Sequence, residues 1–83
     1  MKILYFAWLR QHIGAAEETV APPASVTTGA GLIDWLAARS AGHAAAFQDR
    51  GAIRIAINQT FAEPDDSILG AREVAFFPPV TGG

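Results

Sequence analysis

The sequence contains no cysteine among its 83 residues. This absence excludes a disulfide framework, a thiolate nucleophile and any metal site built on thiolates. Histidine is scarce too, and because neither His12 nor His43 lies beside a carboxylate cluster in the sequence, we expect both on the surface and no metal site. No Ser-His-Asp set has a helpful spacing, and no glycine-rich phosphate loop follows a strand, so the body of the chain carries no recognisable catalytic motif.

Positive charge is sparse and scattered along the chain. Six Lys and Arg residues stand against eight Asp and Glu residues, which gives a net charge of −2. Because no basic stripe is present to neutralise phosphates, nucleic-acid binding is disfavoured.

Long apolar runs are also missing. A membrane-spanning helix needs about 20 consecutive apolar residues, and no stretch approaches that length. The opening "MKILYFAWLRQ" is apolar enough for a signal peptide, but it alternates at strand period and leads to no small-residue cleavage site. We therefore expect it to belong to the folded domain, and we expect a cytoplasmic protein with no membrane partner.

Hydrophobic residues, by contrast, are abundant and make up 51% of the chain. The length predicts one domain, and a chain of this size buries roughly 60% of the surface that it exposes when unfolded. Some apolar side chains should therefore remain at the surface, where exposed apolar patches usually indicate a partner.

The first apolar run, residues 2–9, is typical of a central strand covered on both faces, closing before Gly14. A period of two places Ile3, Tyr5 and Ala7 on one face and Leu4, Phe6 and Trp8 on the other. A second, shorter strand is expected at residues 17–21, and the two prolines that follow it end its hydrogen-bond ladder.

The clearest helix signal begins at Thr27 or Thr28, either of which can cap the first turn. Leu32, Trp35 and Leu36 form one apolar stripe at helical spacing, and Gly42 is placed as a C-terminal cap. The segment that follows, residues 43–51, predicts a second short helix.

Strand signals return in the second half of the chain. Residues 52–58 alternate apolar and polar, "NQ" predicts a turn, and Phe61 begins a short return strand. A solvated loop containing Asp65 and Asp66 leads to a last strand at residues 73–77. This order predicts an α+β domain with a mixed sheet packed on one main helix, in which the first and last strands lie side by side.

Three phenylalanines are candidates for a partner surface. Phe6 and Phe77 fall on the non-core faces of neighbouring strands, and Phe61 lies on the return strand. Any one of them would fit core packing, but the three together predict an exposed aromatic patch, because aromatic residues anchor interfaces.

The sequence ends in "FPPVTGG", directly after the last strand. Pro78 and Pro79 stop the strand and hold the backbone extended, so the chain divides into a domain at residues 1–78 and a tail at residues 79–83. Gly82 and Gly83 lack side chains and fit a narrow channel. Attack of the terminal carboxylate on ATP would give an acyl adenylate, from which a sulfur or nitrogen nucleophile would displace AMP.

The segments "FAWLR", "AINQ" and "EVAFFPPVTGG" resemble those of the small subunits of molybdopterin synthase, a family of ubiquitin-like sulfur carriers with the β-grasp fold. Terminal Gly-Gly is shared with ubiquitin and with the thiamin-pathway carrier, whereas the preceding "FFPPVT" selects the molybdopterin branch. The resemblance covers the full length of the chain.

The resemblance implies a cycle in which an E1-like adenylating enzyme uses ATP to activate Gly83, after which sulfur is installed as a thiocarboxylate. The tail then enters the large subunit of a heterotetrameric synthase and gives sulfur to cyclic pyranopterin monophosphate. It implies partner contacts at Phe6, Phe61, Phe77 and Arg10 and along the tail at Pro78, Pro79, Val80 and Thr81, with no cofactor or metal bound by the chain itself. Two alternatives stay open: a carrier for thiamin or another thiolated product, and an interaction domain whose tail is never charged.

Overall fold

The computed structural model describes residues 1–79; the predicted tail residues Val80, Thr81, Gly82 and Gly83 lie outside the described part of the chain. In chain order the elements are β1 Lys2–Tyr5, α1 Trp8–Ile13, β2 Glu17–Thr19, α2 Gly29–Ala37, α3 Ala41–Ala46, a 3-10 turn η1 Arg50–Ala52, β3 Arg54–Ile57, β4 Thr60–Ala62 and β5 Glu73–Phe77.

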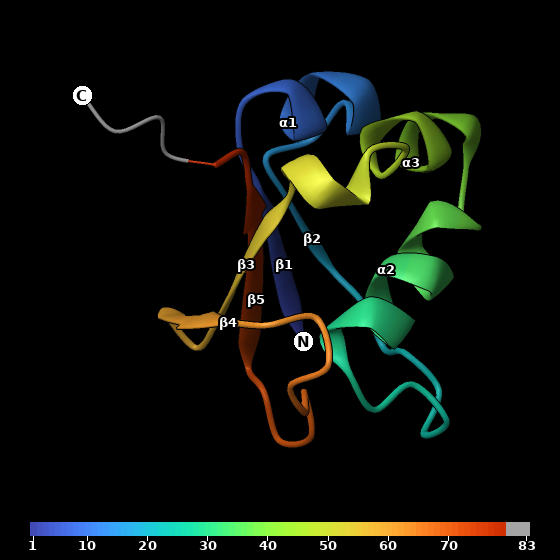
Figure 1. The fold of residues 1–83 in the computed structure, drawn as a ribbon. Coiled ribbons are helices and arrows are strands. Elements are labelled where there is room, and N and C mark those ends of the chain that lie inside the picture. The colour runs from blue at the N-terminus through green and yellow to red at the C-terminus, as the bar shows by residue number, and fades with distance from the viewer. Residues whose placement is uncertain (80–83) are drawn as a thin grey trace.

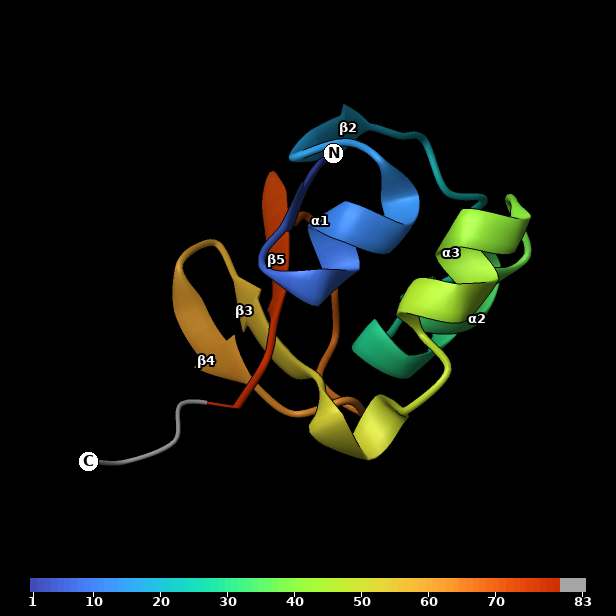
Figure 2. The ribbon, with the colours of Figure 1, turned by 90° about the horizontal axis from the view of Figure 1, so that it is seen from above.

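The five strands form one mixed sheet in the order β2-β1-β5-β3-β4. β1 and β5 pair in parallel at the centre, while β2 on β1, β3 on β5 and β4 on β3 are antiparallel. Figures 1 and 2 show the three helices gathered on one side of this sheet, with its other face uncovered by helices. The predicted α+β class and β-grasp arrangement are confirmed, as is the pairing of the first and last strands.

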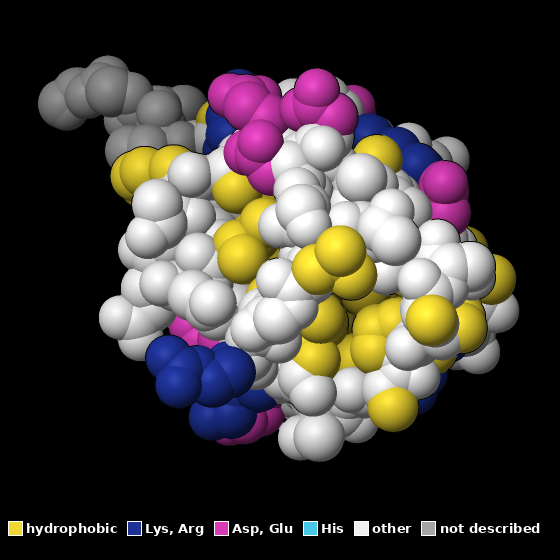
Figure 3. Space-filling view, turned by 90° about the horizontal axis from the view of Figure 1, so that it is seen from below, with side chains coloured by type: hydrophobic (Ala, Val, Ile, Leu, Met, Phe, Trp, Pro, Cys, Tyr) yellow, Lys and Arg dark blue, Asp and Glu magenta, His cyan; other side chains and the backbone are white. Residues whose placement is uncertain are grey.

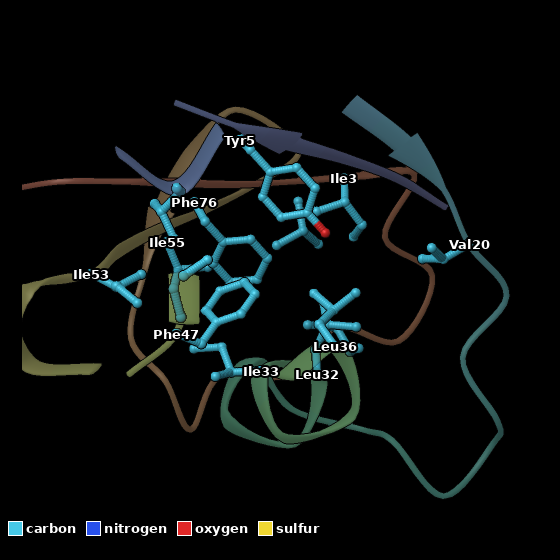
Figure 4. Packing of buried hydrophobic residues seen from close by; sticks show 14 residues of the cluster. Ile3, Tyr5, Val20, Leu32, Ile33, Leu36, Phe47, Ile53, Ile55 and Phe76 are labelled. Atoms are coloured by element: carbon cyan, nitrogen blue, oxygen red, sulfur yellow. The ribbon is translucent and has the colours of Figure 1, made fainter. Parts of the chain in front are cut away.

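The core fills the space between the sheet and α2. Alternate strand residues point inward from the sheet, and one stripe of α2 meets them (Figure 4). Tyr5, Phe47 and Phe76 pack ring against ring, with Phe47 and Phe76 edge to face at a centroid separation of 5.1 Å. The side chains that complete the core are Ile3, Leu9, Val20, Leu32, Ile33, Leu36, Ala46, Ile53, Ile55, Ile68 and Val74.

The hairpin between β3 and β4 turns at the predicted position. Asn58 and Gln59 have φ values of 48° and 69°, as a two-residue turn of type I′ requires. The Asn58 side-chain oxygen also accepts the main-chain N–H groups of Arg72 and Glu73 at 2.9 and 3.1 Å, which ties the turn to the start of β5.

The prediction of one strand over residues 2–9 is wrong beyond Tyr5. The chain turns at Ala7, whose φ is 55°, and residues 8–13 form α1, which ends at Gly14 in the left-handed conformation. A short apolar run does not distinguish a strand from a buried helix, and here Leu9 is fully buried as a helical residue. Trp8 therefore packs against the core from α1 rather than lying on the outer side of a strand.

The predicted helix start is confirmed, but its predicted end is wrong. Thr28 caps α2 by accepting the Gly31 N–H at 3.1 Å, whereas Gly42 lies inside α3, which begins after the N-cap Ser40. A Cβ on Gly42 would lie 2.4 Å from the main-chain oxygen of His12, so the glycine is required where α1 and α3 cross rather than as a cap.

Three other boundaries also differ from the sequence analysis. The second helix, expected at residues 43–51, begins at Ala41 and ends at Ala46. The second strand ends at Thr19, two residues short of the expected end, and β3 covers Arg54–Ile57 rather than residues 52–58. The last strand, at Glu73–Phe77, lies where the alternation placed it.

Candidate docking face

The face of the sheet opposite the helices carries a continuous group of apolar side chains, called the outer face below. Its position follows from the period of two along β5. Val74 and Phe76 are fully buried, so the side chains of Ala75 and Phe77 point to the other side of the sheet. The outer face consists of Leu4, Phe6, Ala56, Phe61, Ala75, Phe77 and Pro78, which line a shallow groove of about 630 Å³ together with Gln59 and Glu73.

The three candidate phenylalanines meet on this face. Phe61 is 79% exposed and Phe6 is 49% exposed, although both are large apolar residues. The rings of Phe61 and Phe77 lie 5.8 Å apart at an interplanar angle of 50°. Phe61 is paired with the small Ala56 in the β3–β4 ladder, and both residues line the groove.

β5 carries the outer face directly into the end of the described chain. Phe77 is the last residue of the strand, and the half-buried Pro78 and Pro79 follow it. Neither proline has an N–H to continue the ladder. Phe77 and Pro78 of the outer face therefore lead directly into the predicted tail.

Arg10 is not part of the outer face. It lies on α1, is exposed, and lines neither groove described for residues 1–79. Its predicted partner contact stays a prediction.

The prediction that His43 lies on the surface is wrong, whereas His12 is exposed as expected. His43 is 7% exposed, and its Nε2 lies 2.6 Å from Glu18 Oε1 of β2. Because an ionised carboxylate only accepts, Nε2 carries the hydrogen and donates it. Glu18 is 25 residues away in the sequence, which is why sequence spacing gave no sign of the pair.

Ser40 extends this pair into a row of three polar groups. Its Oγ lies 2.7 Å from His43 Nδ1, and it also accepts the His43 main-chain N–H at 3.1 Å as the N-cap of α3. Acid, imidazole and hydroxyl in a row are the parts of a nucleophilic triad. Here the hydroxyl oxygen is already used as a helix cap, so the row ties the edge strand β2 to α3.

The charge on Glu18 is stabilised by its neighbours. Burial alone would raise the pKa of this carboxyl, but the hydrogen bond from His43 and the positive charge of Arg39, whose Nη2 lies 3.7 Å away, bring that pKa below its usual value of 4.5. Glu18 is therefore a carboxylate at neutral pH.

Within residues 1–79, no group of three or more His, Cys, Asp or Glu side chains is placed to hold a metal ion. The described helices include none with the length and apolar character needed to cross a membrane. The surface seen from below shows a group of acidic side chains at its upper margin and a group of Lys and Arg at its lower left, with further charges of both signs along its margins and hydrophobic side chains over its middle (Figure 3).

Comparison with known proteins gives three consistent results. The model of the ThiS family matches residues 3–83. The molybdopterin synthase sulfur carrier subunit of Escherichia coli is 41% identical over 83 residues, covering 100% of this chain and 99% of the relative, and the carrier subunit of the same name from Haemophilus influenzae is 32% identical with the same coverage. The crystal structure of SAMP1 from Haloferax volcanii superposes with a TM-score of 0.71 at 25% identity, covering 100% of this chain and 98% of that one.

Proposed function

Because the chain belongs to the ThiS family, we propose that it is a sulfur carrier for molybdopterin synthesis and that the carboxylate of Gly83 is the group that carries sulfur. The observation that carries this proposal is full-length similarity to molybdopterin synthase sulfur carrier subunits, combined with the "FPPVTGG" ending. The geometry supports it, since β5 joins an exposed apolar face to that ending.

The outer face is the proposed docking surface for the large subunit of the synthase. Phe6, Phe61 and Phe77 expose aromatic area that the isolated chain does not cover, and aromatic residues are enriched in the buried cores of protein interfaces. The sheet beneath them is held by ladders on both sides of β5, so the rings are presented on a rigid support.

The chemistry of sulfur loading takes place on the tail. In the proposed series of reactions, the Gly83 carboxylate attacks the α-phosphorus of ATP bound by an E1-like adenylating partner. The products are an acyl adenylate and pyrophosphate. Sulfur at the oxidation level of sulfide then attacks the acyl carbon, the bond to AMP breaks, and a thiocarboxylate is left on Gly83. The absence of cysteine from the whole sequence fits this route, because no side-chain thiol is available to hold the sulfur.

Delivery completes the proposed cycle. The charged tail enters the large subunit, where the thiocarboxylate sulfur displaces an oxygen substituent from a carbon of cyclic pyranopterin monophosphate. Water then cleaves the acyl–sulfur bond, which leaves the sulfur on the product and returns Gly83 to a carboxylate. Two such transfers build the dithiolene of molybdopterin. Gly82 and Gly83, having no side chains, suit a channel in which any Cβ would collide with the wall.

Deletion of Gly83 tests the proposal. The carboxylate then lies on Gly82, about 3.3 Å short of its former position, and a misplacement of even about 1 Å costs about 100-fold in a positioned reaction. We expect mass spectrometry after incubation with the adenylating enzyme, ATP and a sulfur source to show no thiocarboxylate on the truncated chain. Addition of one residue after Gly83 should fail in the same way, while both variants still bind the large subunit through the outer face.

The same experiment separates the alternatives. Full thiolation of the truncated chain would falsify the terminal-carrier mechanism. An intact chain that never gains the mass of sulfur in place of oxygen would indicate an interaction domain. A chain that is thiolated but gives no molybdopterin with the large subunit would indicate a carrier for another thiolation pathway.

A further inference from the structure

Arg54 points to the same side of the sheet as the outer face and is the direct neighbour of Phe77. The two residues are paired in the antiparallel β3–β5 ladder, and paired residues point to the same face with Cβ atoms about 4.5–5.5 Å apart. Ile53 and Ile55 on either side of Arg54 are buried at 5% and 3% exposure, which confirms that Arg54 points away from the core. A positive side chain therefore borders the aromatic group at the end of the sheet where β5 ends.

Arg54, Phe61 and Phe77 line a groove of about 720 Å³, which also includes Arg50, Glu63 and Asp66. It adjoins the shallower groove of the outer face, because Phe61 and Phe77 line both. A partner that covers these two rings therefore also comes into contact with Arg54.

The other three charged side chains of this groove are either paired within the protein or held in water by a loop turn. Arg50 forms an ion pair with Asp34 of α2. Asp66 Oδ2 accepts the main-chain N–H of Glu63 at 2.7 Å, and this loop turn keeps both carboxylates in water, where they are exposed.

Arg54 itself forms no ion pair within residues 1–79. Its Nη1 donates to the main-chain oxygens of Gly51 and Ile53 at 3.2 and 3.4 Å, which fixes one arm of the guanidinium. A guanidinium has five N–H donors in a planar fork. Hydrogen bonds from Nε and Nη2 to protein atoms are absent from the described part of the chain, so those donors are satisfied by water in the free protein.

A partner that covers Phe77 displaces water from the neighbouring guanidinium of Arg54. A desolvated charge without a partner opposes binding strongly, so an interface tolerates it only where an acceptor of opposite charge replaces the water. We infer that the large subunit places an Asp or Glu carboxylate against Arg54, beside the pocket that receives Phe77 and Phe61. This inference rests on the proposed docking of the large subunit on the outer face.

A planar guanidinium with one arm already fixed suits a two-point contact with such a carboxylate. The pair would also discriminate between partners, since a surface with a positive or apolar group at this point would leave Arg54 unpaired. Arg54 is thus the specificity-determining residue of the outer face, while the phenylalanines supply the buried area.

The experiment measures the affinity and dissociation rate of the purified large subunit for the full-length chain and for four variants. We expect Arg54→Gln to weaken binding about tenfold and Arg54→Glu at least about 100-fold, mainly through faster dissociation, as for a desolvated charge pair. Arg54→Lys should fall between wild type and Arg54→Gln, because it keeps the charge and loses the fork.

Arg72→Glu is the matched control. Arg72 is exposed and precedes β5 at the end opposite Phe77, and its hydrogen bonds within residues 1–79 are made by its main-chain atoms. Arg72→Glu therefore makes the same change in net charge away from the groove. We expect the affinity of Arg72→Glu to stay within about threefold of wild type, and we expect any difference to come from the association rate rather than the dissociation rate. Thermal unfolding of each variant establishes that it is folded.

Two results would overturn the inference. Equal weakening by Arg54→Glu and Arg72→Glu would show that only net charge matters, and unchanged binding by Arg54→Gln would show that no carboxylate faces this residue. In both cases the large subunit still binds the wild-type chain, so the proposed function stands. Failure of the wild-type chain itself to bind would reject the docking proposal and this inference together.

Discussion

Phe61→Ala should separate binding from folding more cleanly than any other substitution on the outer face. The ring is 79% exposed in the isolated chain, so little of its area contributes to folding. Complete burial of a phenylalanine side chain is worth roughly 1.5–3 kcal/mol. The buried fifth of Phe61 therefore contributes about 0.3–0.6 kcal/mol to the free energy of unfolding.

The exposed part gives the expected loss of affinity. If the large subunit covers it, removal of the ring costs about 1.2–2.4 kcal/mol of binding free energy, which corresponds to roughly 8- to 60-fold weaker binding. Isothermal titration calorimetry with the purified large subunit measures this change, and thermal unfolding of the free chain measures the effect on folding.

Leu69→Ala is the matched control for this prediction. Leu69 is also a large apolar residue and is 71% exposed, but it lies in the loop before β5 and lines neither groove. We expect its affinity for the large subunit to equal that of the wild-type chain. If Phe61→Ala and Leu69→Ala bind equally well, the outer face is not the docking surface, and the assignment of the phenylalanines must be abandoned.

Two further predictions concern the body of the domain. Gly42→Ala should lower the free energy of unfolding by about 1–3 kcal/mol, because its Cβ would lie 2.4 Å from the His12 oxygen; urea unfolding checks this, and Gly51→Ala, whose Cβ would meet nothing closer than 3.7 Å, should differ little from wild type. The lowered pKa of Glu18 means that the folded chain binds fewer protons than the unfolded chain, so stability is full above about pH 4.5 and falls as the pH drops through the folded-state pKa. Glu18→Gln should reduce this acid dependence in urea titrations between about pH 6 and pH 3, and identical pH profiles for the two chains would contradict the role given to Glu18.

The elements that the sequence predicted well are those whose pattern is local. Alternation in β3 and β5 states which residues face the core, and the burial of Ile55, Val74 and Phe76 agrees with it. The exposure of Phe6 agrees with the outer face that alternation gave it, and the exposure of Phe61 agrees with its grouping with Phe6 and Phe77 as an aromatic patch. The Asn58-Gln59 turn was equally local, since its conformation depends on two residues.

The elements that the sequence analysis missed depend on contacts between distant segments. The first two residues of α1, Trp8 and Leu9, were taken for strand because they continue the apolar run of β1, and only the turn at Ala7 separates the two elements. Gly42 was taken for a cap because it follows a helical pattern. The true constraint on it is the close approach of the His12 main chain, which the sequence does not reveal. The burial of His43 required a carboxylate from β2, which no spacing rule along the chain connects to it.

The position of Phe77 on β5 limits where a partner can carry out chemistry on the proposed tail. Ladders with β1 on one side and β3 on the other fix β5, so a partner that holds Phe77 also fixes the start of Pro78. From Pro78 to Gly83 is six residues, which span at most about 20 Å when extended. Every partner that docks on the outer face and acts on Gly83 must therefore place its reacting atoms within about 20 Å of the pocket that receives Phe77. The adenylating enzyme and the large subunit would satisfy the same limit with unrelated active sites, because the distance is set by this chain.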